Sequence, residues 1–343
     1  MRRLRTRIKA AADIRTALAG GRAAFARCFA ALAVLLAAAT LQGCADFLVR
    51  VSTHPPYHGN SIRHECRRWE KRVPGITAWI DSLRTAGALK DTFVVADDGV
   101  KLHAYYMDAA VDSPAAPANS LRTAIVVHGF VVNQMNVMML ARMYRDSLGY
   151  NVLLPALRHH GKSGGKEVQF GWKDRLDLLR WAEVAHGIFA DTLQVFHGES
   201  MGAATVMMAS GEQTPPYVRG FIEDCGYSSV WDIMSHCQQN LLRLKVEPTL
   251  SRASEKCRRR YGWDWREASS VNQLAKCSKP MLFIHGNADP LVPVWMAQTC
   301  YDAKVDGYRE LWIAEGSGHS WAYPDHPAEY VARVRSFLRR EVE

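Results

Sequence analysis

The sequence predicts an α/β fold, in which a mostly parallel sheet is covered by helices on both faces. Two observations lead to this prediction. From residue 124 onward, short apolar runs such as AIVVH (124–128) alternate with segments long enough to form helices. These runs are continuously apolar, which is typical of parallel strands that are buried on both faces. Folds of this class carry their chemistry in the loops at the carboxyl ends of the strands.

The expected elements begin with a β-hairpin. TFVVA (92–96) and VKLHAYYM (100–107) flank the turn Asp97-Asp98-Gly99, which is a typical hairpin turn. After the strand at 124–128, further strands are expected at 150–157, 192–197, 218–225, 280–285 and 308–314. Helices are expected at 135–148, 172–188, 201–211, 293–304 and 326–341, with an irregular helical stretch over 228–272.

Residues 44–90 precede this pattern and are predicted to form a linker and a helical leader that packs on the main domain. Four apolar residues fall at helical spacing in it, namely Ile76, Trp79, Ile80 and Leu83. Pro74-Gly75 breaks any helix before them. The main domain is therefore expected to span residues 91–343.

Residues 1–43 are predicted to be a lipoprotein signal peptide. They hold eight basic residues and one acidic residue, and they end in the uncharged run CFAALAVLLAAATL (28–41). Leu41-Gln42-Gly43-Cys44 resembles the lipobox of bacterial lipoproteins, in which the cysteine receives a diacylglycerol and becomes the first residue. The resemblance implies lipidation at Cys44 and a place in the bacterial cell envelope, on a periplasmic or surface face. A plain signal anchor and an ordinary signal peptide are the alternatives.

The net charge of +9 comes mostly from this N-terminal segment. The other 300 residues hold 35 basic and 33 acidic side chains, which gives no electrostatic case for binding nucleic acid. No strongly apolar run of membrane-spanning length follows residue 46, so a polytopic membrane protein is excluded. An exported protein can oxidise its cysteines, but the sequence does not decide their pairing. Beyond Cys28 and Cys44, these cysteines are Cys66, Cys225, Cys237, Cys257, Cys277 and Cys300.

Two segments match the pattern G-x-S-x-G, in which a serine nucleophile occupies a sharp turn between a strand and a helix. GESMG (198–202) follows the strand LQVFH and precedes the apolar helical segment MGAATVMMAS, so Ser200 has both expected neighbours. GKSGG (161–165) follows Arg158-His159-His160 and precedes more glycine, which indicates a flexible loop. We therefore predict Ser200 as the nucleophile, with a strained backbone, and not Ser163.

A serine hydroxyl needs a general base, and that base needs an acid to orient it. His319 lies in the glycine-flanked loop GSGHS, just past the last expected strand. Asp289 lies in HGNADP, just past the strand before it. The chain order Ser, Asp, His is the order found in α/β-hydrolases. The competing acids are Glu223, Asp224 and Glu315.

Acyl transfer also requires two N–H donors for the developing oxyanion. The backbone amide of Met201, directly after the predicted nucleophile, is expected to be one of them. The other is expected from Phe130, in the loop that follows the strand at 124–128. The His128 side chain is predicted to buttress this loop, and Gly129 permits the backbone to approach the substrate closely.

His128-Gly129-Phe130, RHHGKSG (158–164), GESMG, HGNAD and GSGH together resemble the α/β-hydrolase superfamily, in particular its serine-esterase and serine-aminopeptidase-like group. The resemblance covers about residues 90–341. Relatives typically have Arg-Gly-His-Gly where this chain has Arg158-His159-His160-Gly161, so His159 replaces a glycine and the backbone of that loop is expected to differ.

The resemblance implies an α/β-hydrolase fold with an eight-stranded, mostly parallel sheet and a small helical cap inserted at about residues 227–275. It also implies a serine hydrolase that acts without a cofactor, and it does not imply a metal. The expected substrate is a small-molecule carboxylic ester. The alternatives are peptide or amide cleavage, perhydrolysis with the same triad, and a membrane-tethered binding protein without turnover. Two roles are open for the cap helices: they line an acyl pocket, or they only pack on the core.

Overall fold

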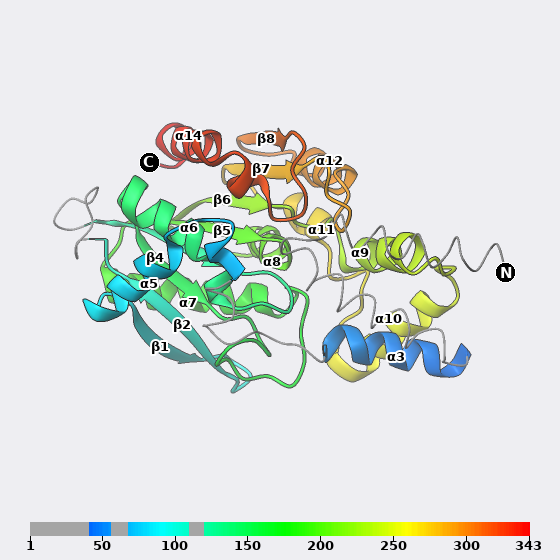
Figure 1. The fold of residues 1–343 in the computed structure, drawn as a ribbon. Helices are drawn as coiled ribbons and strands as arrows, with labels where there is room; N and C mark the ends of the chain where they lie inside the picture. The colour runs from blue at the N-terminus through cyan, green and yellow to red at the C-terminus, as the bar shows by residue number, and fades with distance from the viewer. Residues whose placement is uncertain (1–40, 56–67, 110–119) are drawn as a thin grey trace.

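The computed structural model describes residues 41–55, 68–109 and 120–343 (Figure 1). The predicted signal peptide up to residue 40 lies outside these residues, as does Cys66. Cys44 belongs to the backbone of helix α3 (Leu41–Thr53), but its side chain is outside what is described, so lipidation stays a prediction. Among the helices in the described ranges, none has the length and apolar character needed to cross a membrane.

The centre of the molecule is one eight-stranded sheet with the order β1-β2-β4-β3-β5-β6-β7-β8. β2 is antiparallel to both of its neighbours, and the other pairs are parallel. The strands are β1 (Lys90–Val95), β2 (Lys101–Met107), β3 (Arg122–Val127), β4 (Asn151–Pro155), β5 (Leu193–Glu199), β6 (Val218–Asp224), β7 (Met281–Gly286) and β8 (Arg309–Ala314). This architecture confirms the predicted α/β-hydrolase fold.

Each face of the sheet carries its own hydrophobic core, because successive side chains of a strand point to opposite faces. In β3, Ile125 and Val127 belong to one core, whereas Ala124 and Val126 belong to the other. The first core includes side chains of α7 (Asp174–Phe189), α8 (Met201–Ser210), α11 (Ser270–Leu274) and α12 (Trp295–Ala303). The second includes side chains of α5 (Ile76–Thr85), α6 (Met138–Arg142) and α14 (Pro327–Phe337).

Two of the expected helices are less regular than the sequence suggests. The segment expected at 135–148 begins as the 3₁₀ turn η1 (Gln134–Val137), continues as α6 and ends as the π-helical η2 (Met143–Leu148). The closing helix likewise changes from α14 to the π-helical η4 (Leu338–Val342). Apolar spacing predicts that a helix forms, but it does not distinguish these hydrogen-bonding patterns.

The insertion after β6 is helical and packs beside the N-terminal helix. It consists of α9 (Val230–His236), the π-helical η3 (Cys237–Leu241), α10 (Thr249–Tyr261) and α11. α3 lies against α10 (Figure 1), and Asp46 of α3 forms ion pairs with Lys256 and Arg260. The cysteines whose side chains are described carry free thiols, namely Cys225, Cys237, Cys257, Cys277 and Cys300.

Candidate active site

Ser200 occupies a sharp turn between β5 and α8. Its backbone has φ 59° and ψ −118°, a region that non-glycine residues rarely adopt, as the sequence predicts for this position. Two glycines make the turn possible. A Cβ added to Gly198 would lie 2.2 Å from the carbonyl oxygen of Gly202, and one added to Gly202 would lie 2.2 Å from that of Val127. The backbone can therefore pass this point only without side chains at both positions.

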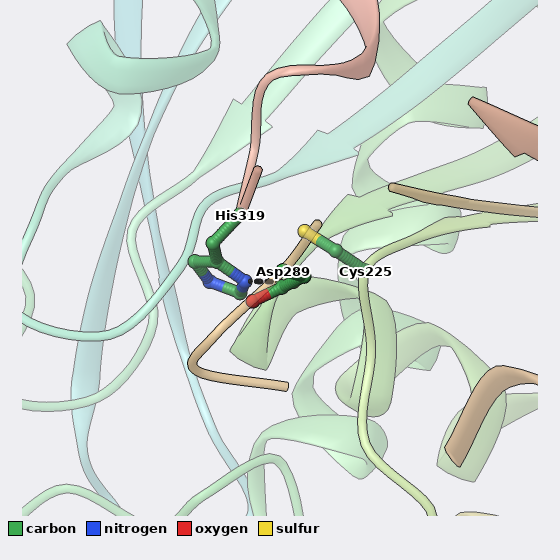
Figure 2. Close-up of side chains that lie close together, drawn as sticks. All are labelled: Cys225, Asp289 and His319. Atoms are coloured by element: carbon green, nitrogen blue, oxygen red, sulfur yellow. Dashed lines mark hydrogen bonds and ion pairs between the residues drawn. The ribbon is translucent and has the colours of Figure 1, made fainter. Parts of the chain in front are cut away.

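The structure brings His319 and Asp289 to this serine. His319 lies in the loop between β8 and α13 (Ala322–Asp325), and its Nε2 is 2.8 Å from Ser200 Oγ. Its Nδ1 is 2.7 Å from Oδ2 of Asp289, which follows β7 (Figure 2). Three side chains that are far apart in the sequence thus form one continuous hydrogen-bonded chain of hydroxyl, imidazole and carboxylate.

The surrounding charges favour a basic imidazole. Burial alone would lower the pKa of His319, but the nearby carboxyl groups of Asp289, Glu199 and Asp224 together raise it above its ordinary value. Burial would raise the pKa of Asp289, but His319 and backbone hydrogen bonding hold it below its ordinary value. The Asp289 Oδ1 atom accepts two backbone N–H groups, at 2.8 and 2.9 Å. Asp289 is therefore an oriented, ionised partner for the ring.

The loop after β3 lies directly against Ser200. A Cβ on Gly129 would be 3.2 Å from the Cβ of Ser200, which shows how closely this backbone approaches the serine. The Phe130 ring stacks on Phe170 with centroids 5.6 Å apart. His128 Nε2 accepts the N–H of Leu157 at 3.1 Å, and burial lowers the pKa of His128 to about 4, so the ring is neutral. His128 thus holds the loop, which is the buttressing position that the sequence predicts.

Met201, the other residue expected to supply an oxyanion donor, is the first residue of α8. The first N–H groups of an α-helix have no partner within the helix and are available to a negatively charged group. The loop at Phe130 and the start of α8 therefore both adjoin the serine.

None of the three competing acids takes the place of Asp289. Glu223 accepts the N–H of Gly226 at 2.9 Å, and Asp224 accepts the hydroxyl of Tyr330 at 2.8 Å. Glu315 is exposed. The carboxylate that is hydrogen-bonded to His319 Nδ1 is that of Asp289.

Glu199, the residue before Ser200, is a part of the site that was not predicted from the sequence. Its side chain is buried, and burial together with the charge of Asp224 raises its pKa to about 8. Its Oε1 accepts a hydrogen bond from Asn136 Nδ2 at 2.8 Å. The signal for it was present in the sequence, because an acidic residue ends an otherwise buried apolar strand.

Cys225 is a second residue that the sequence analysis did not place at the site. Its thiol lies beside Asp289 and His319 (Figure 2), and the three potential ligand atoms lie within 4.8 Å of one another. Both ring nitrogens of His319 are already hydrogen-bonded, and burial raises the pKa of the Cys225 thiol well above its ordinary value. We therefore interpret Cys225 as a neutral thiol packed beside Asp289 and His319, and we do not assign a metal to this group.

Residues 156–343 match the model of the prolyl oligopeptidase family. The chain belongs to this family. It is 31% identical over 224 residues to the uncharacterized protein YqkD of Bacillus subtilis (strain 168). The match covers 65% of this chain and 73% of YqkD.

Solved structures show the same fold at lower identity. An esterase of Pyrococcus furiosus, Pf2001, is 24% identical with a TM-score of 0.60, over 76% of this chain and 96% of that one. Est1E of Butyrivibrio proteoclasticus, solved with ferulic acid, is 23% identical with a TM-score of 0.56, over 73% and 98%. An acylaminoacyl peptidase of Pyrococcus horikoshii is 14% identical with a TM-score of 0.54, over 76% of this chain and 43% of that one. Family and fold together support a serine hydrolase of the α/β-hydrolase type.

Proposed function

We propose that the protein is a carboxylic-ester hydrolase that works through an acyl-enzyme on Ser200. The observation that carries the proposal is the chain of short contacts from Ser200 Oγ to His319 Nε2, at 2.8 Å, and from His319 Nδ1 to Asp289 Oδ2, at 2.7 Å. This is the arrangement that a serine nucleophile, a general base and an orienting acid require.

In the first half of the reaction, Ser200 Oγ attacks the ester carbonyl carbon while His319 Nε2 takes the hydroxyl proton. The resulting imidazolium is stabilised by Asp289, which remains ionised. The same proton then passes from Nε2 to the leaving alcohol as its C–O bond breaks. In the second half, water attacks the acyl carbon, His319 takes a proton from the water, and that proton returns to Ser200 as the carboxylic acid leaves.

The tetrahedral intermediates carry a negative oxygen, which the backbone N–H groups of Phe130 and Met201 are proposed to bind. Gly129, the neighbour of Phe130, lies against Ser200, and Met201 follows the serine directly. These positions support the assignment, because the site needs preorganised donors that do not move during the reaction. Each such donor typically contributes about 10²–10³-fold to turnover.

The coverage of the structural matches supports an ester over a peptide substrate. The match spans 96% and 98% of the two esterase chains, but only 43% of the acylaminoacyl peptidase chain. This chain therefore resembles the esterases over nearly their whole length and the peptidase over less than half. Peptide or amide cleavage is the second candidate, because the matching family model is that of the prolyl oligopeptidases.

A substrate panel tests the choice. Short and medium nitrophenyl esters are compared with aminoacyl and N-acyl-aminoacyl nitroanilides, under conditions in which a fluorophosphonate probe labels Ser200. We expect kcat/KM for the best ester to exceed that for the best anilide by at least ~10²-fold. Faster turnover of the anilides would replace the esterase proposal with the peptidase. Failure of both substrate classes and of the probe would favour a binding protein without turnover.

We also propose that a lipid on Cys44 anchors the protein in the bacterial cell envelope. The lipobox-like sequence supports this, and α3, in which Cys44 lies, packs on α10, so the anchor would be attached close to the cap. Labelling of the full-length chain with radioactive palmitate tests the proposal. We expect Cys44→Ser to abolish the label and to release the protein from the membrane fraction.

A further inference from the structure

The N-terminal leader contacts the loop that carries His319. The Arg72 guanidinium carbon lies 4.2 Å from the ring centroid of Trp321 and 4.8 Å from that of Trp69. Trp321 is two residues after His319, and Trp69 is only 2% exposed. A guanidinium at these distances from an aromatic face is attracted by the electrons of the ring. Arg72 thus joins the leader to the loop that holds the base.

A second set of contacts runs from the same segment to the nucleophile. Trp69 Nε1 donates to Asn136 Oδ1 at 3.0 Å, and Asn136 Nδ2 donates to Glu199 Oε1 at 2.8 Å. Glu199 is the residue directly before Ser200, and all three of these side chains are buried. The leader therefore reaches both halves of the site, the histidine through Arg72 and the serine turn through Trp69.

The backbone of the loop that carries His319 is strained next to the histidine. Ser320, between His319 and Trp321, has φ 60°, and Gly316 at the start of the loop has φ 74°. A non-glycine residue in this region is strained and persists only where its surroundings impose it. The contact between Arg72 and Trp321 is made one residue after the strained position.

We propose that Arg72 is a positioning residue of the catalytic centre, through which leader residues 68–73 hold the His319 loop in its productive geometry. The proposal rests on the hydrolase function proposed above. The leader lies before the stretch that matches the family model, which begins at residue 156. The charge of Arg72 also lowers the pKa of Glu199, against the larger raising effects of burial and of Asp224.

The test compares Arg72→Met, which keeps the aliphatic contact but removes the charge, with Arg72→Lys, which restores the charge. The control is Arg333→Met, because Arg333 lies 5.0 Å from the ring centroid of Trp312 and makes the same kind of contact away from the histidine loop. We expect Arg72→Met to lower kcat about tenfold with KM changed less than about twofold, since a misplaced base slows the chemical step and not substrate binding. Arg72→Lys should recover most of the loss, and Arg333→Met should retain the wild-type kcat.

Further measurements distinguish a loss of positioning from misfolding and from failure of the proposed function. Rates are expressed per site titrated with fluorophosphonate, and Trp321→Leu is tested alone and with Arg72→Met, where we expect the losses not to add. In protein labelled with ¹⁵N-histidine, the His319 signals should change in Arg72→Met and not in Arg333→Met. Unchanged His319 signals, or an unchanged kcat per titrated site, would overturn the positioning role. A wild-type protein that is inert toward every ester, anilide and phosphonate overturns the hydrolase proposal instead.

Discussion

GESMG and GKSGG share one sequence pattern but have different structures. Ser200 lies on a strained turn between a strand and a helix, and its Oγ is 2.8 Å from the ring of His319. Ser163 lies in a loop, and its Oγ donates to the carbonyl oxygen of Ala156 at 2.7 Å and accepts the N–H of His103 at 2.9 Å. The first hydroxyl faces a titratable base, whereas the second is occupied by backbone groups. The pattern therefore has chemical meaning only together with its flanking strand and helix.

The loop of Ser163 shows another way in which the backbone decides residue choice. His159 stands where the sequence resemblance leads us to expect glycine, and it adopts φ 64°, the left-handed conformation that favours glycine. The ring Nδ1 of His159 lies 3.3 Å from the carbonyl oxygen of Gly165. That the backbone of this loop differs from that of relatives stays a prediction.

The largest effect is expected from Ser200→Ala. In the proposed mechanism, no acyl-enzyme forms without the hydroxyl, and the remaining groups only bind and polarise the ester. We expect kcat to fall by at least ~10⁴-fold, measured with nitrophenyl esters, while the thermal unfolding midpoint stays close to that of the wild type. Hydrolysis at the wild-type rate would show that GESMG is not the nucleophile turn.

Asp289→Asn should have the next largest effect, because Ser200 in the proposed mechanism depends on an oriented His319. An amide at this position no longer favours the ring tautomer that leaves Nε2 free to accept the serine proton. We expect kcat to fall about 10⁴-fold. Asp224→Asn is the matched comparison, since Asp224 is a buried acid that affects His319 but is hydrogen-bonded to Tyr330. An equal or larger loss in Asp224→Asn would reverse the assignment of the acid.

Much of the fold was predictable because its signals are local. A buried parallel strand is continuously apolar, so TLQVFH (192–197) predicts β5, which the structure has at Leu193–Glu199. The order of Ser200, Asp289 and His319 along the chain also followed from the loops after successive strands. These signals depend on residues within a few positions of one another, which a single sequence displays directly.

The parts that were not predicted depend on contacts between distant residues. Trp69 and Asn136 are 67 positions apart, and no spacing within either segment indicates that they meet. The raised pKa of Glu199 likewise requires burial and the nearby Asp224 of another strand. The residues in the loops at the sheet edge were therefore predictable, whereas the buried residues that support them, such as Trp69 and Glu199, were not.

Gly202→Ala tests whether the turn at Ser200 requires a residue without a side chain at position 202. The added methyl group would lie 2.2 Å from the carbonyl oxygen of Val127, so the turn must shift. We expect kcat to fall about 10²-fold, as for a displacement of about 1 Å at the reacting atoms. In GKSGG, a Cβ on Gly164 would be 3.1 Å from the carbonyl oxygen of Lys101, a contact that a small shift relieves. Gly164→Ala should therefore have the kcat of the wild type. Equal losses of kcat in the two variants would show that the two G-x-S-x-G segments do not differ in this respect.

The residues before the two serines also make a matched pair. His319 must be neutral to accept the serine proton, so kcat/KM should fall as the pH drops through its raised pKa. Glu199, whose pKa is raised to about 8, is protonated over this limb and carries a charge only above it. Glu199→Gln should therefore leave the acidic limb in place and lower kcat/KM only above about pH 8, where the wild-type carboxylate favours the charged ring. Lys162, before Ser163, is exposed and pairs with Asp91. Lys162→Gln should leave the whole profile unchanged, and an acidic limb that moves in Glu199→Gln would show that this carboxyl is already ionised beside the base at lower pH.

The smallest effect on turnover is expected from Ser163→Ala, which completes the comparison. The substitution removes two hydrogen bonds and leaves the N–H of His103 without its acceptor, which should cost about 1–3 kcal/mol of unfolding free energy. Denaturant unfolding measures that cost, and ester hydrolysis at the same temperature should stay within about twofold of the wild type, because no atom of Ser163 is needed for the chemical step. A loss of activity without a loss of stability would mean that the second G-x-S-x-G segment takes part in the reaction after all.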